Sequence, residues 1–460
     1  MLQQAVQSVA ERRAYGKSLR QAVPRADHAI WSPGQRRTDP VALIEAQNED
    51  RLQSLVPLRR ARMLASPFAF YRATAVVMAA DLAVGPSSGL SVQASGDAHL
   101  ANFGFYASPE RRLVFDLNDF DETLAGPWEW DVKRLAASFA IAARHNGIGG
   151  KKAQTIVRRS VSSYRKAMAR LAEMRTTDVW YAHLREEHAL DVAADEGQAK
   201  DIKQIARKAR GRDSRQALDK LAEEANDNYR IRNDPPGLMP FRELPHGLSE
   251  EGLDAVVAQS FSDYQRSLAD NVRRLLDRFT PVDEALKVVG VGSVGTVCTV
   301  MLLMGRDRHD PLFLQIKEAG RSVLEAHLPR SRYRNHGRRV VEGQRLMQTT
   351  SDIFLGWTHS KLSGRDYYWR QLRDWKGSAD VEDASAADLR YQARLCGWTL
   401  ARSHARSGDP VAIAGYLGSG DAFIDAVTLY AEAYADQNER DYEAYAGEVR
   451  VRGLEVAEEA

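Results

Sequence analysis

A short polar segment, Gly96-Asp97-Ala98-His99-Leu100-Ala101-Asn102, places an aspartate and an asparagine at the spacing Asp-x-x-x-x-Asn. Loops that transfer phosphoryl groups use this spacing. The carboxylate accepts the proton of an attacking hydroxyl, and the neutral amide binds magnesium without adding charge beside that base. Asp97 is therefore the candidate base and Asn102 a candidate metal ligand. A turn in which both side chains cap backbone amides is the alternative interpretation.

A second polar segment, Val114 to Glu122, is an apolar run that ends in several carboxylates. Crowded carboxylates are unfavourable unless a cation neutralises them. Asp119 and Asp121 are therefore candidate magnesium ligands, and Asp119-Phe120-Asp121 stands where the metal-binding turn of a kinase would stand. A solvated acidic turn is the alternative.

The third motif is Gly290-Val291-Gly292-Ser293-Val294-Gly295-Thr296-Val297, which fits Gly-x-Gly-x-x-Gly-x-Val. Glycines allow a backbone hairpin to approach phosphate oxygens and donate N–H groups to them. A dinucleotide-binding turn needs a helix directly after the glycines. The residues that follow are strand-like, which favours a hairpin that covers a nucleotide, with Gly290, Gly292, Ser293 and Gly295 as binding residues.

The fourth feature is an apolar strand, Leu312 to Lys317, that ends in a single lysine. A lysine on the strand after a glycine hairpin can hold nucleotide phosphates and pair with a glutamate from a helix. Glu342 is the candidate partner and Glu325 the second choice. A lysine and a glutamate that face solvent are the alternatives.

Together these motifs resemble the aminoglycoside phosphotransferase and choline kinase type of enzyme, whose loop usually reads His-Gly-Asp-x-His-x-x-Asn. This resemblance implies that Asp97 is the base and that Asn102 and Asp119 bind magnesium, while the first histidine is replaced by Ser95. Most of the chain resembles more closely a bacterial family of unknown function, DUF2252, which implies no substrate. The motifs of that likeness are LASPFAFYR, GDAHLANFG, FDLNDFDE and WEWDVKRLA.

The order of the motifs differs from that of kinases, in which the glycine loop and lysine precede the catalytic loop. Here they follow it, so a kinase-like fold requires circular permutation, which surface termini allow. The helix that ends at His404 then resembles the one that normally leads into the catalytic loop. We therefore predict that the Lys317 ammonium lies within salt-bridge distance of Asp119. We also expect the glycine hairpin to lie above this pair.

The composition is that of a globular protein: 460 residues, 44% hydrophobic, 27% charged and a net charge of +2. No global charge favours nucleic acid, and two cysteines suit a reducing cytoplasm. The N-terminus shows no signal peptide. Val288 to Gly305 lacks charges, but its four glycines and its valines and threonines predict two buried strands joined by a turn rather than a membrane span.

We expect a bilobal α+β fold, kinase-like and circularly permuted, with a β-rich small lobe and a helical large lobe. Strands are predicted at Ser91–Ala94 and Leu113–Leu117, and a helix at Asp131–Arg144. The expected parts are an N-terminal helical segment (1–80), a large lobe with the catalytic and metal loops (81–280), a small nucleotide-binding lobe (281–376) and C-terminal helices that complete the large lobe (377–460).

The expected activity is a phosphotransferase that uses ATP and magnesium on a hydroxyl of a small-molecule acceptor. A non-catalytic nucleotide-binding protein and a nucleotidyl transferase are the alternatives. Two basic stretches, the arginines from Arg59 to Arg72 and those from Arg330 to Arg339, are interpreted as solvated faces, with anion-binding surfaces as the alternative.

Overall fold

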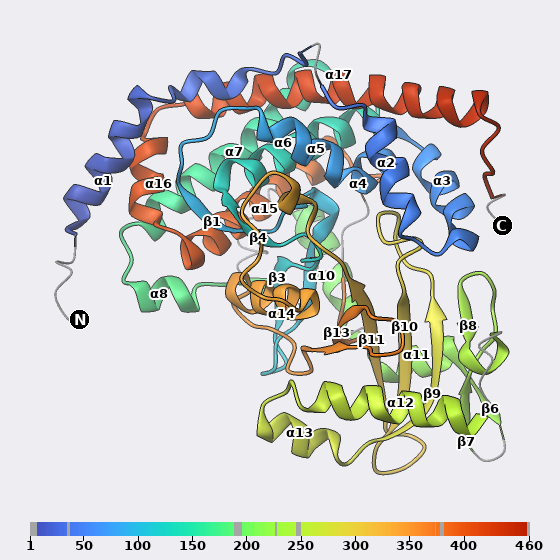
Figure 1. The fold of residues 1–460 in the computed structure, drawn as a ribbon. Helices are drawn as coiled ribbons and strands as arrows, with labels where there is room; N and C mark the ends of the chain where they lie inside the picture. Colours follow the sequence, from blue (N-terminus) through green and yellow to red (C-terminus); the bar gives the residue numbers. More distant parts are fainter. Residues whose placement is uncertain are drawn as a thin grey trace.

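A computed structural model describes residues 7–34, 37–187, 196–225, 228–244, 250–372, 374–377 and 381–457. Helices form one part of the molecule and a six-stranded sheet forms the centre of the other (Figure 1). The α+β class predicted from the sequence is therefore confirmed, including a separate sheet lobe.

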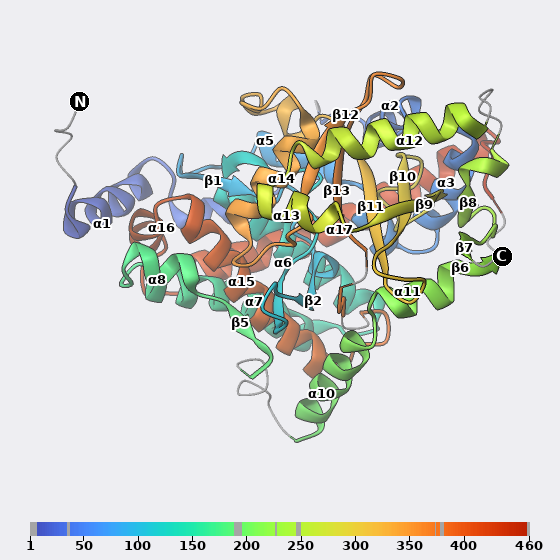
Figure 2. The ribbon, with the colours of Figure 1, turned by 90° about the horizontal axis from the view of Figure 1, so that it is seen from below.

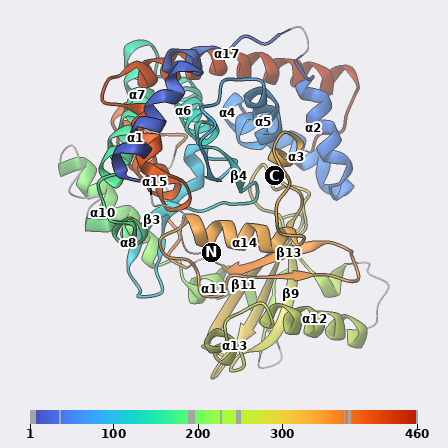
Figure 3. The same cartoon turned by 60° about the vertical axis from the view of Figure 1, so that its left-hand side comes forward.

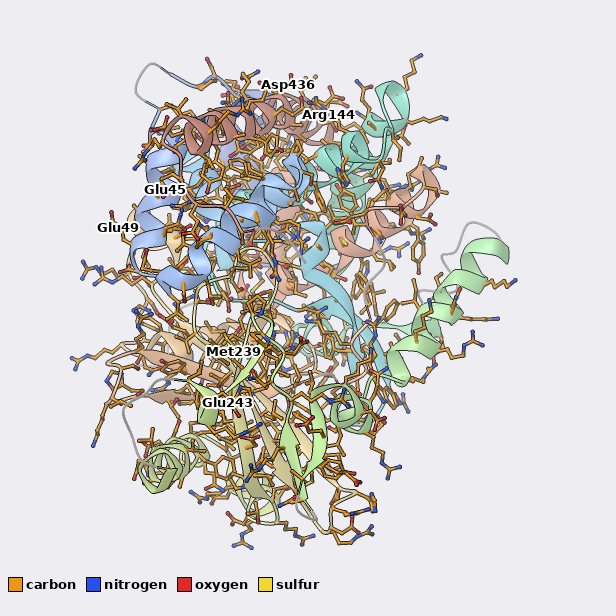
Figure 4. All side chains as sticks on the ribbon, turned by 90° about the vertical axis from the view of Figure 1, so that its right-hand side faces the viewer. Glu45, Glu49, Arg144, Met239, Glu243 and Asp436 are labelled. Atoms are coloured by element: carbon orange, nitrogen blue, oxygen red, sulfur yellow. The ribbon has the colours of Figure 1, made fainter. Side chains whose placement is uncertain are left out.

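The helical part is built around α6 (Trp128–His145), which is buried on nearly all sides. Its neighbours are α7 (Gly150–Leu171), α15 (Ala386–Ser407) and α17 (Ala422–Val451). Its buried positions include charged residues such as Asp131 and Arg134, which need partners inside the core. The ring of Trp128 stacks on Tyr164 at 5.6 Å between centroids. At the other end of α6, Arg144 pairs with Asp436 of α17 at 2.7 Å; both are labelled in Figure 4.

The N-terminal helices cover this core. They are α1 (Val9–Ser18), η1 (Leu19–Gln21), η2 (Arg25–Ala29), α2 (Pro40–Glu49), η3 (Gln53–Leu55), α3 (Val56–Leu64), α4 (Pro67–Ala73) and α5 (Ala75–Ala83). Ser8, Asp39 and Ser66 cap three of them with side-chain hydrogen bonds. α1 packs on α16 (Pro410–Leu417), whereas α2 to α5 lie between α17 and the sheet part (Figures 1 and 3).

Short strands flank the loop that carries Asp97. β1 (Ser91–Ala94) pairs with β4 (Leu124–Pro127), and β2 (Phe103–Ala107) pairs with β3 (Leu113–Leu117), which also pairs with β5 (Leu184–Arg185). The bounds predicted for β1 and β3 are confirmed. The sequence did not predict β2 and β4. Both are short, and each is a strand only because it pairs with a neighbour, β3 or β1. The predicted helix at Asp131–Arg144 lies within α6.

The large sheet has the strand order β12-β13-β11-β10-β9-β8, with antiparallel neighbours throughout. Its strands are β8 (Leu238–Pro240), β9 (Thr280–Lys287), β10 (Cys298–Met304), β11 (Pro311–Ala319), β12 (Gly356–His359) and β13 (Asp366–Gln371). Alternate residues of β10 enter different cores: Val300 and Leu302 face one side, and Met301 and Leu303 face the other. This is the two-residue period of a strand that is buried on both faces.

Helices cover both faces of this sheet (Figure 2). α11 (Ser214–Leu221) contributes to one core, and α12 (Glu250–Gln265) and α13 (Asp270–Leu276) contribute to the other. α14 (His336–Met347) packs on β11, β12 and β13 on the side of the helical part (Figure 1). The packing of the sheet thus includes elements before residue 281, from the segment that the sequence analysis assigned to the large lobe.

The remaining elements are short or peripheral. They are η4 (Leu100–Asn102), α8 (Thr176–Tyr181), α10 (Glu196–Arg210), β6 (Ala222–Ala225), β7 (Asn228–Ile231), η5 (Phe241–Glu243) and η6 (Val323–Ala326). Figure 4 shows Met239 of β8 and Glu243 of η5 on the sheet part, below Glu45 and Glu49 of α2.

The uncharged stretch from Val288 to Gly305 contains one strand, β10, preceded by a loop that carries three of the four glycines. The prediction of two strands within this stretch is therefore wrong, because the first strand of the hairpin, β9, ends at Lys287. No helix in the described ranges combines the length and apolarity that crossing a bilayer requires.

Candidate functional site

A cleft of about 830 Å³ lies between the helical part and the sheet part. Residues from all three predicted loops line it: Asp97, Asn102, Asp119, Asp121, Gly290, Gly292 and Ser293. These loops are far apart in the sequence. The fold therefore brings most of the predicted site residues to one cavity, whose size suits a small ligand.

The loop that carries Asp97 is held from beneath by Asp131, in the first turn of α6. One Asp131 oxygen accepts the N–H of Ser95 at 2.6 Å, and the other accepts the N–H of Gly96 at 3.0 Å. Gly96 has φ +79°, and a Cβ there would lie 2.4 Å from the Glu122 carbonyl oxygen. Only glycine fits this turn, which directs the chain from β1 towards the cleft.

Asp97 itself pairs with Arg134, one turn further along α6. The Arg134 Nη2 lies 2.7 Å from Asp97 Oδ1, and the Asp97 side chain remains 21% exposed to the cleft. Burial disfavours the Arg134 cation, but the Asp97 carboxylate together with Tyr71 and Tyr434 outweighs this effect and raises the Arg134 pKa. The pair holds the Asp97 carboxylate in one orientation.

His99 lies beside Asp97, with 3.7 Å between its Nε2 and Asp97 Oδ2. Burial lowers the pKa of His99 to about 4, so the ring is neutral at pH 7. Its Nδ1 is buried without a hydrogen-bond partner among the described residues. A neutral imidazole adds no positive charge beside the candidate base.

Asn102 closes the same loop. The Asn102 Nδ2 donates to the backbone carbonyl of Asp97 at 2.8 Å. The backbone carbonyl of Asn102 accepts the N–H of Asn118 at 2.8 Å. The first bond leaves the amide oxygen of Asn102 as the acceptor for a cation. The second bond connects the Asp97 loop to the segment that carries Asp119.

Lys317 reaches the acidic segment from β11. Its Nζ lies 2.6 Å from Asp121 Oδ2 and 3.7 Å from Asp119 Oδ2. The predicted salt-bridge distance between Lys317 and Asp119 is thus confirmed. The Tyr368 hydroxyl donates to the other Asp121 oxygen at 2.6 Å.

The three charges differ in burial. The Lys317 side chain is 3% exposed, whereas those of Asp119 and Asp121 are each about one-third exposed towards the cleft. Burial opposes the Lys317 cation, but Asp119 and Asp121 raise its pKa well above the usual value. Burial also opposes the Asp119 anion, but Lys317 and Arg370 lower its pKa. Both groups are therefore ionised at neutral pH, as binding of phosphate and metal requires.

The glycine loop is held against the N-terminal helices. Leu52 N donates to the Gly295 carbonyl at 2.8 Å, Arg51 Nη1 to the Val294 carbonyl at 2.6 Å, and Arg62 Nη1 to the Gly290 carbonyl at 2.5 Å. Gly290, Gly292 and Ser293 line the cleft, whereas Gly295 lies against the Arg51 side chain. The N-terminal segment thus forms part of the site, which the sequence analysis did not anticipate.

The predicted pairing of Glu342 with Lys317 is wrong in this structure. Glu342 lies on α14, but its carboxylate is 3.6 Å from Arg345 of the same helix. The carboxylates that compensate Lys317 are Asp119 and Asp121, which already lie beside it. The second choice, Glu325, lines the cleft with one carboxylate oxygen buried and without a partner in the described part of the chain.

α14 contributes Arg339 to the site instead of Glu342. Its guanidinium donates to the carbonyls of Asp121 at 2.7 Å, Thr123 at 2.8 Å and Gly320 at 2.9 Å. Arg339 is buried, so its interpretation as part of a solvated face is wrong. It fixes the backbone of the acidic segment rather than Lys317.

The first basic stretch also departs from the solvated face expected of it. Arg59 is fully buried and bonded to Asn48, and Arg72 lines the cleft. Arg134 was likewise missed, although it belongs to the quoted WEWDVKRLA segment. Its spacing of three residues from Asp131 on one helix was the available signal.

Asp119, Asp121 and Asn102 supply oxygen atoms, the donors that magnesium prefers. Within the described ranges, no three His, Cys, Asp or Glu side chains are grouped so that they could hold a metal alone. Magnesium commonly binds one or two carboxylates and completes its shell with phosphate and water. The residues present therefore fit a cation whose remaining ligands are not protein side chains.

These features define a class: a two-part α+β protein with a polar cleft between the parts, where a buried lysine meets paired carboxylates. The chain belongs to the bacterial family DUF2252, described as "Uncharacterized protein conserved in bacteria", whose profile matches residues 51–448. No curated protein and no solved structure matches the chain.

Proposed function

We propose that the protein is a phosphotransferase that transfers the γ-phosphoryl group of ATP, with magnesium, to a hydroxyl of a small molecule. The observation that carries this proposal is the meeting of Lys317 with Asp119 and Asp121 in the cleft that Asp97, Asn102 and the glycine loop also line. Phosphoryl transfer needs phosphate-holding groups, metal ligands and a base that converge on one phosphate.

The proposed fold is kinase-like with a circularly permuted order. The helix that ends near His404 supports it, because His404 Nε2 lies 3.1 Å from Asp131 Oδ2, which also holds the Asp97 loop. A helix from the C-terminal end thus packs beside the catalytic loop, as permutation requires. Its histidine supports the loop in which Ser95 replaces the usual histidine.

In this mechanism Lys317 and the N–H groups of the glycine loop bind the nucleotide phosphates. Asn102 and Asp119, together with Asp121, would hold magnesium, which would supply neutralisation of the phosphate charge. Asp97 accepts the proton of the acceptor hydroxyl. The hydroxyl oxygen forms a bond to the γ-phosphorus, the bond from that phosphorus to the bridging oxygen breaks, and ADP leaves.

A small acceptor is favoured over a protein because the chain between Asp119 and Asp131 is short. It contains β4 and the beginning of α6, so it has no room for a long activation segment that could hold a peptide. The cleft volume of about 830 Å³ also suits small ligands.

The test is a melting experiment with millimolar Mg-ATP, followed by incubation of the protein with γ-labelled ATP and a bacterial metabolite extract. Binding to the folded state raises the melting temperature by mass action. We expect stabilisation, label in a small molecule and accumulation of ADP. Lys317→Met is the control, since its side chain has a similar length without the charge.

Each alternative has a distinct result. Accumulation of AMP with label in pyrophosphate would favour a nucleotidyl transferase, since the α-phosphorus would then be attacked. Stabilisation by Mg-ATP without nucleotide consumption would favour a non-catalytic binding protein. If Mg-ATP neither stabilises the protein nor is consumed by it, the proposal is refuted.

A further inference from the structure

A second cavity, of about 670 Å³, lies on the other side of the catalytic loop. We call it the aromatic cavity, because Phe68, Phe103, Phe105 and Phe115 line it together with Leu100 and Leu395. Its volume is within the range of small-molecule sites, and mostly apolar walls with a few polar groups are typical of them. The mechanism above leaves this cavity without a role.

The catalytic loop separates the two cavities. Asp97, His99 and Asn102 line the cleft, whereas Leu100 and Ala101, between them in the sequence, line the aromatic cavity. A ligand in the aromatic cavity therefore lies against the back of the loop that carries the candidate base.

Arg72 lines both cavities, so it stands where they meet. Its guanidinium carbon lies 5.9 Å from the centre of the Phe68 ring on the side of the aromatic cavity. The Asp97 carboxylate interacts with it electrostatically from the side of the cleft.

The Arg72 guanidinium is poorly compensated. Its Nε is buried without a hydrogen-bond partner among the described residues, and no carboxylate of the described part forms a salt bridge with it. Burial lowers the Arg72 pKa, although Glu382 and Asp97 act in the opposite direction. The Arg72 side chain is half-buried, and a ligand anion would supply its guanidinium with the bonded partner that the described residues do not.

The other charged groups around the aromatic cavity are of both signs: Lys208, Arg212, Glu382, Asp383 and Asp388. Asp388 already belongs to the capping box of α15 with Ser385, and Arg212 donates to the Lys376 carbonyl. Arg72 differs from all of them in reaching both cavities.

We propose that the aromatic cavity binds the acceptor, a small molecule with a flat apolar body, an anionic group on Arg72 and a hydroxyl that extends past Arg72, where the two cavities meet, to Asp97 in the cleft. This proposal rests on the phosphotransferase proposed above. The apolar body packs among the phenylalanines, and the carboxylate or phosphate of the acceptor pairs with Arg72. The hydroxyl then passes its proton to Asp97 as its oxygen bonds to the γ-phosphorus and ADP departs.

The experiment uses 4-benzoylbenzoate, a photoreactive aromatic carboxylate, with the full chain. After irradiation, we expect saturable crosslinks to residues of the aromatic cavity, mapped by mass spectrometry of peptides. The neutral analogue 4-benzoylbenzamide should label the same residues at least about tenfold more weakly, because it cannot pair with Arg72. Crosslinks only elsewhere, or none, would overturn the proposal.

Two variants refine this test. Arg72→Leu removes the anion partner, and Ile205→Trp fills the cavity from a half-buried position on α10. Both should reduce crosslinking about tenfold or more, whereas Arg330→Leu, which alters only the cleft, should not. If both variants that alter the cavity label like the unmodified chain, the proposal is wrong. Should either variant melt early, the benzoate and benzamide comparison on the unmodified chain decides.

Melting with Mg-ATP on the same samples separates the two proposals. Crosslinks in the aromatic cavity without stabilisation by Mg-ATP would keep the cavity as a ligand site and refute the phosphotransferase. Stabilisation by Mg-ATP without those crosslinks would leave the phosphotransferase and refute this acceptor site.

Discussion

His404 Nε2 lies 3.1 Å from Asp131 Oδ2, although α15 and α6 are remote in the sequence. The Tyr164 hydroxyl lies 2.9 Å from the other ring nitrogen, so both nitrogens of the buried histidine have partners. His404 is therefore a core histidine with both ring nitrogens satisfied. Asp131 links this core to the loop that carries Asp97.

Asp131→Ala should lower the free energy of unfolding by about 3 kcal/mol or more. It leaves His404 and the N–H groups of Ser95 and Gly96 without their acceptor, and each unsatisfied buried group costs about 1–3 kcal/mol. Asp131→Asn keeps one acceptor oxygen and should cost less. Thermal and urea unfolding measure both, and the exposed His309→Ala should change stability by less than about 0.5 kcal/mol. Equal stability of Asp131→Ala and the unmodified protein would contradict this role.

Asp97→Asn and Asp119→Ala should separate transfer from binding. If Asp97 is the base, Asp97→Asn should reduce transfer by about 10²–10⁴-fold, with Mg-ATP binding nearly intact. Asp119→Ala should instead weaken Mg-ATP binding, because it removes a metal ligand. Calorimetric titration and labelled-phosphate transfer provide the two measurements. If both variants lose binding equally and unfold early, the acidic segments are structural and the site assignment is wrong.

Glu122 should make stability depend on pH. Burial raises its pKa to about 7 from 4.5, although Arg339 and the N–H of Val323 oppose this shift. The folded chain therefore binds a proton between these values that the unfolded chain has released, so this group's contribution to stability falls as pH rises through that range.

Glu122→Gln should remove this effect. The free energy of unfolding of the variant, relative to that of the unmodified protein, should rise by about 1–2 kcal/mol between pH 5 and pH 8. This value is reduced for the partial exposure of the side chain. Urea unfolding at both pH values measures the difference. Burial also raises the pKa values of Glu284 and Asp352. Both residues are present in both proteins, so their contributions to the pH dependence of stability cancel in the comparison. Parallel pH profiles would show that Glu122 ionises as readily in the folded chain as in the unfolded chain.

Gly290 and Gly295 form a matched pair in the glycine loop. Both have positive φ, +67° and +88°, but a Cβ at Gly290 would meet open space, whereas one at Gly295 would lie 3.0 Å from the Arg51 Cβ. Gly290→Ala should therefore lower the free energy of unfolding by about 1 kcal/mol, because a residue with a Cβ is strained at positive φ. Gly295→Ala should cost more and weaken Mg-ATP binding, since it pushes the loop off the N-terminal helices. Denaturant unfolding and titration test this order, and equal costs would mean that Arg51 does not constrain the loop.

Local features of the fold followed from the sequence. Apolar runs bounded by turn residues predicted β1 and β3 with the observed bounds, and helical periodicity placed a helix within α6. The residue types in the loops also predicted a cation beside the acidic segment, because carboxylates crowded beside a strand end need a cation wherever they lie. The resemblance to DUF2252 rested on such local segments.

The tertiary structure decided which partners these residues meet. The sequence indicated a lysine and a glutamate for pairing, but the docking of α14 directs Arg339 to the acidic segment and leaves Glu342 with Arg345. The sequence alone did not show that Arg72 lies between two cavities, because arginines at helical spacing look alike whether they face solvent or a cleft. Periodicity records only which residues share a face of one element. What that face meets depends on the packing of elements that are distant in the chain.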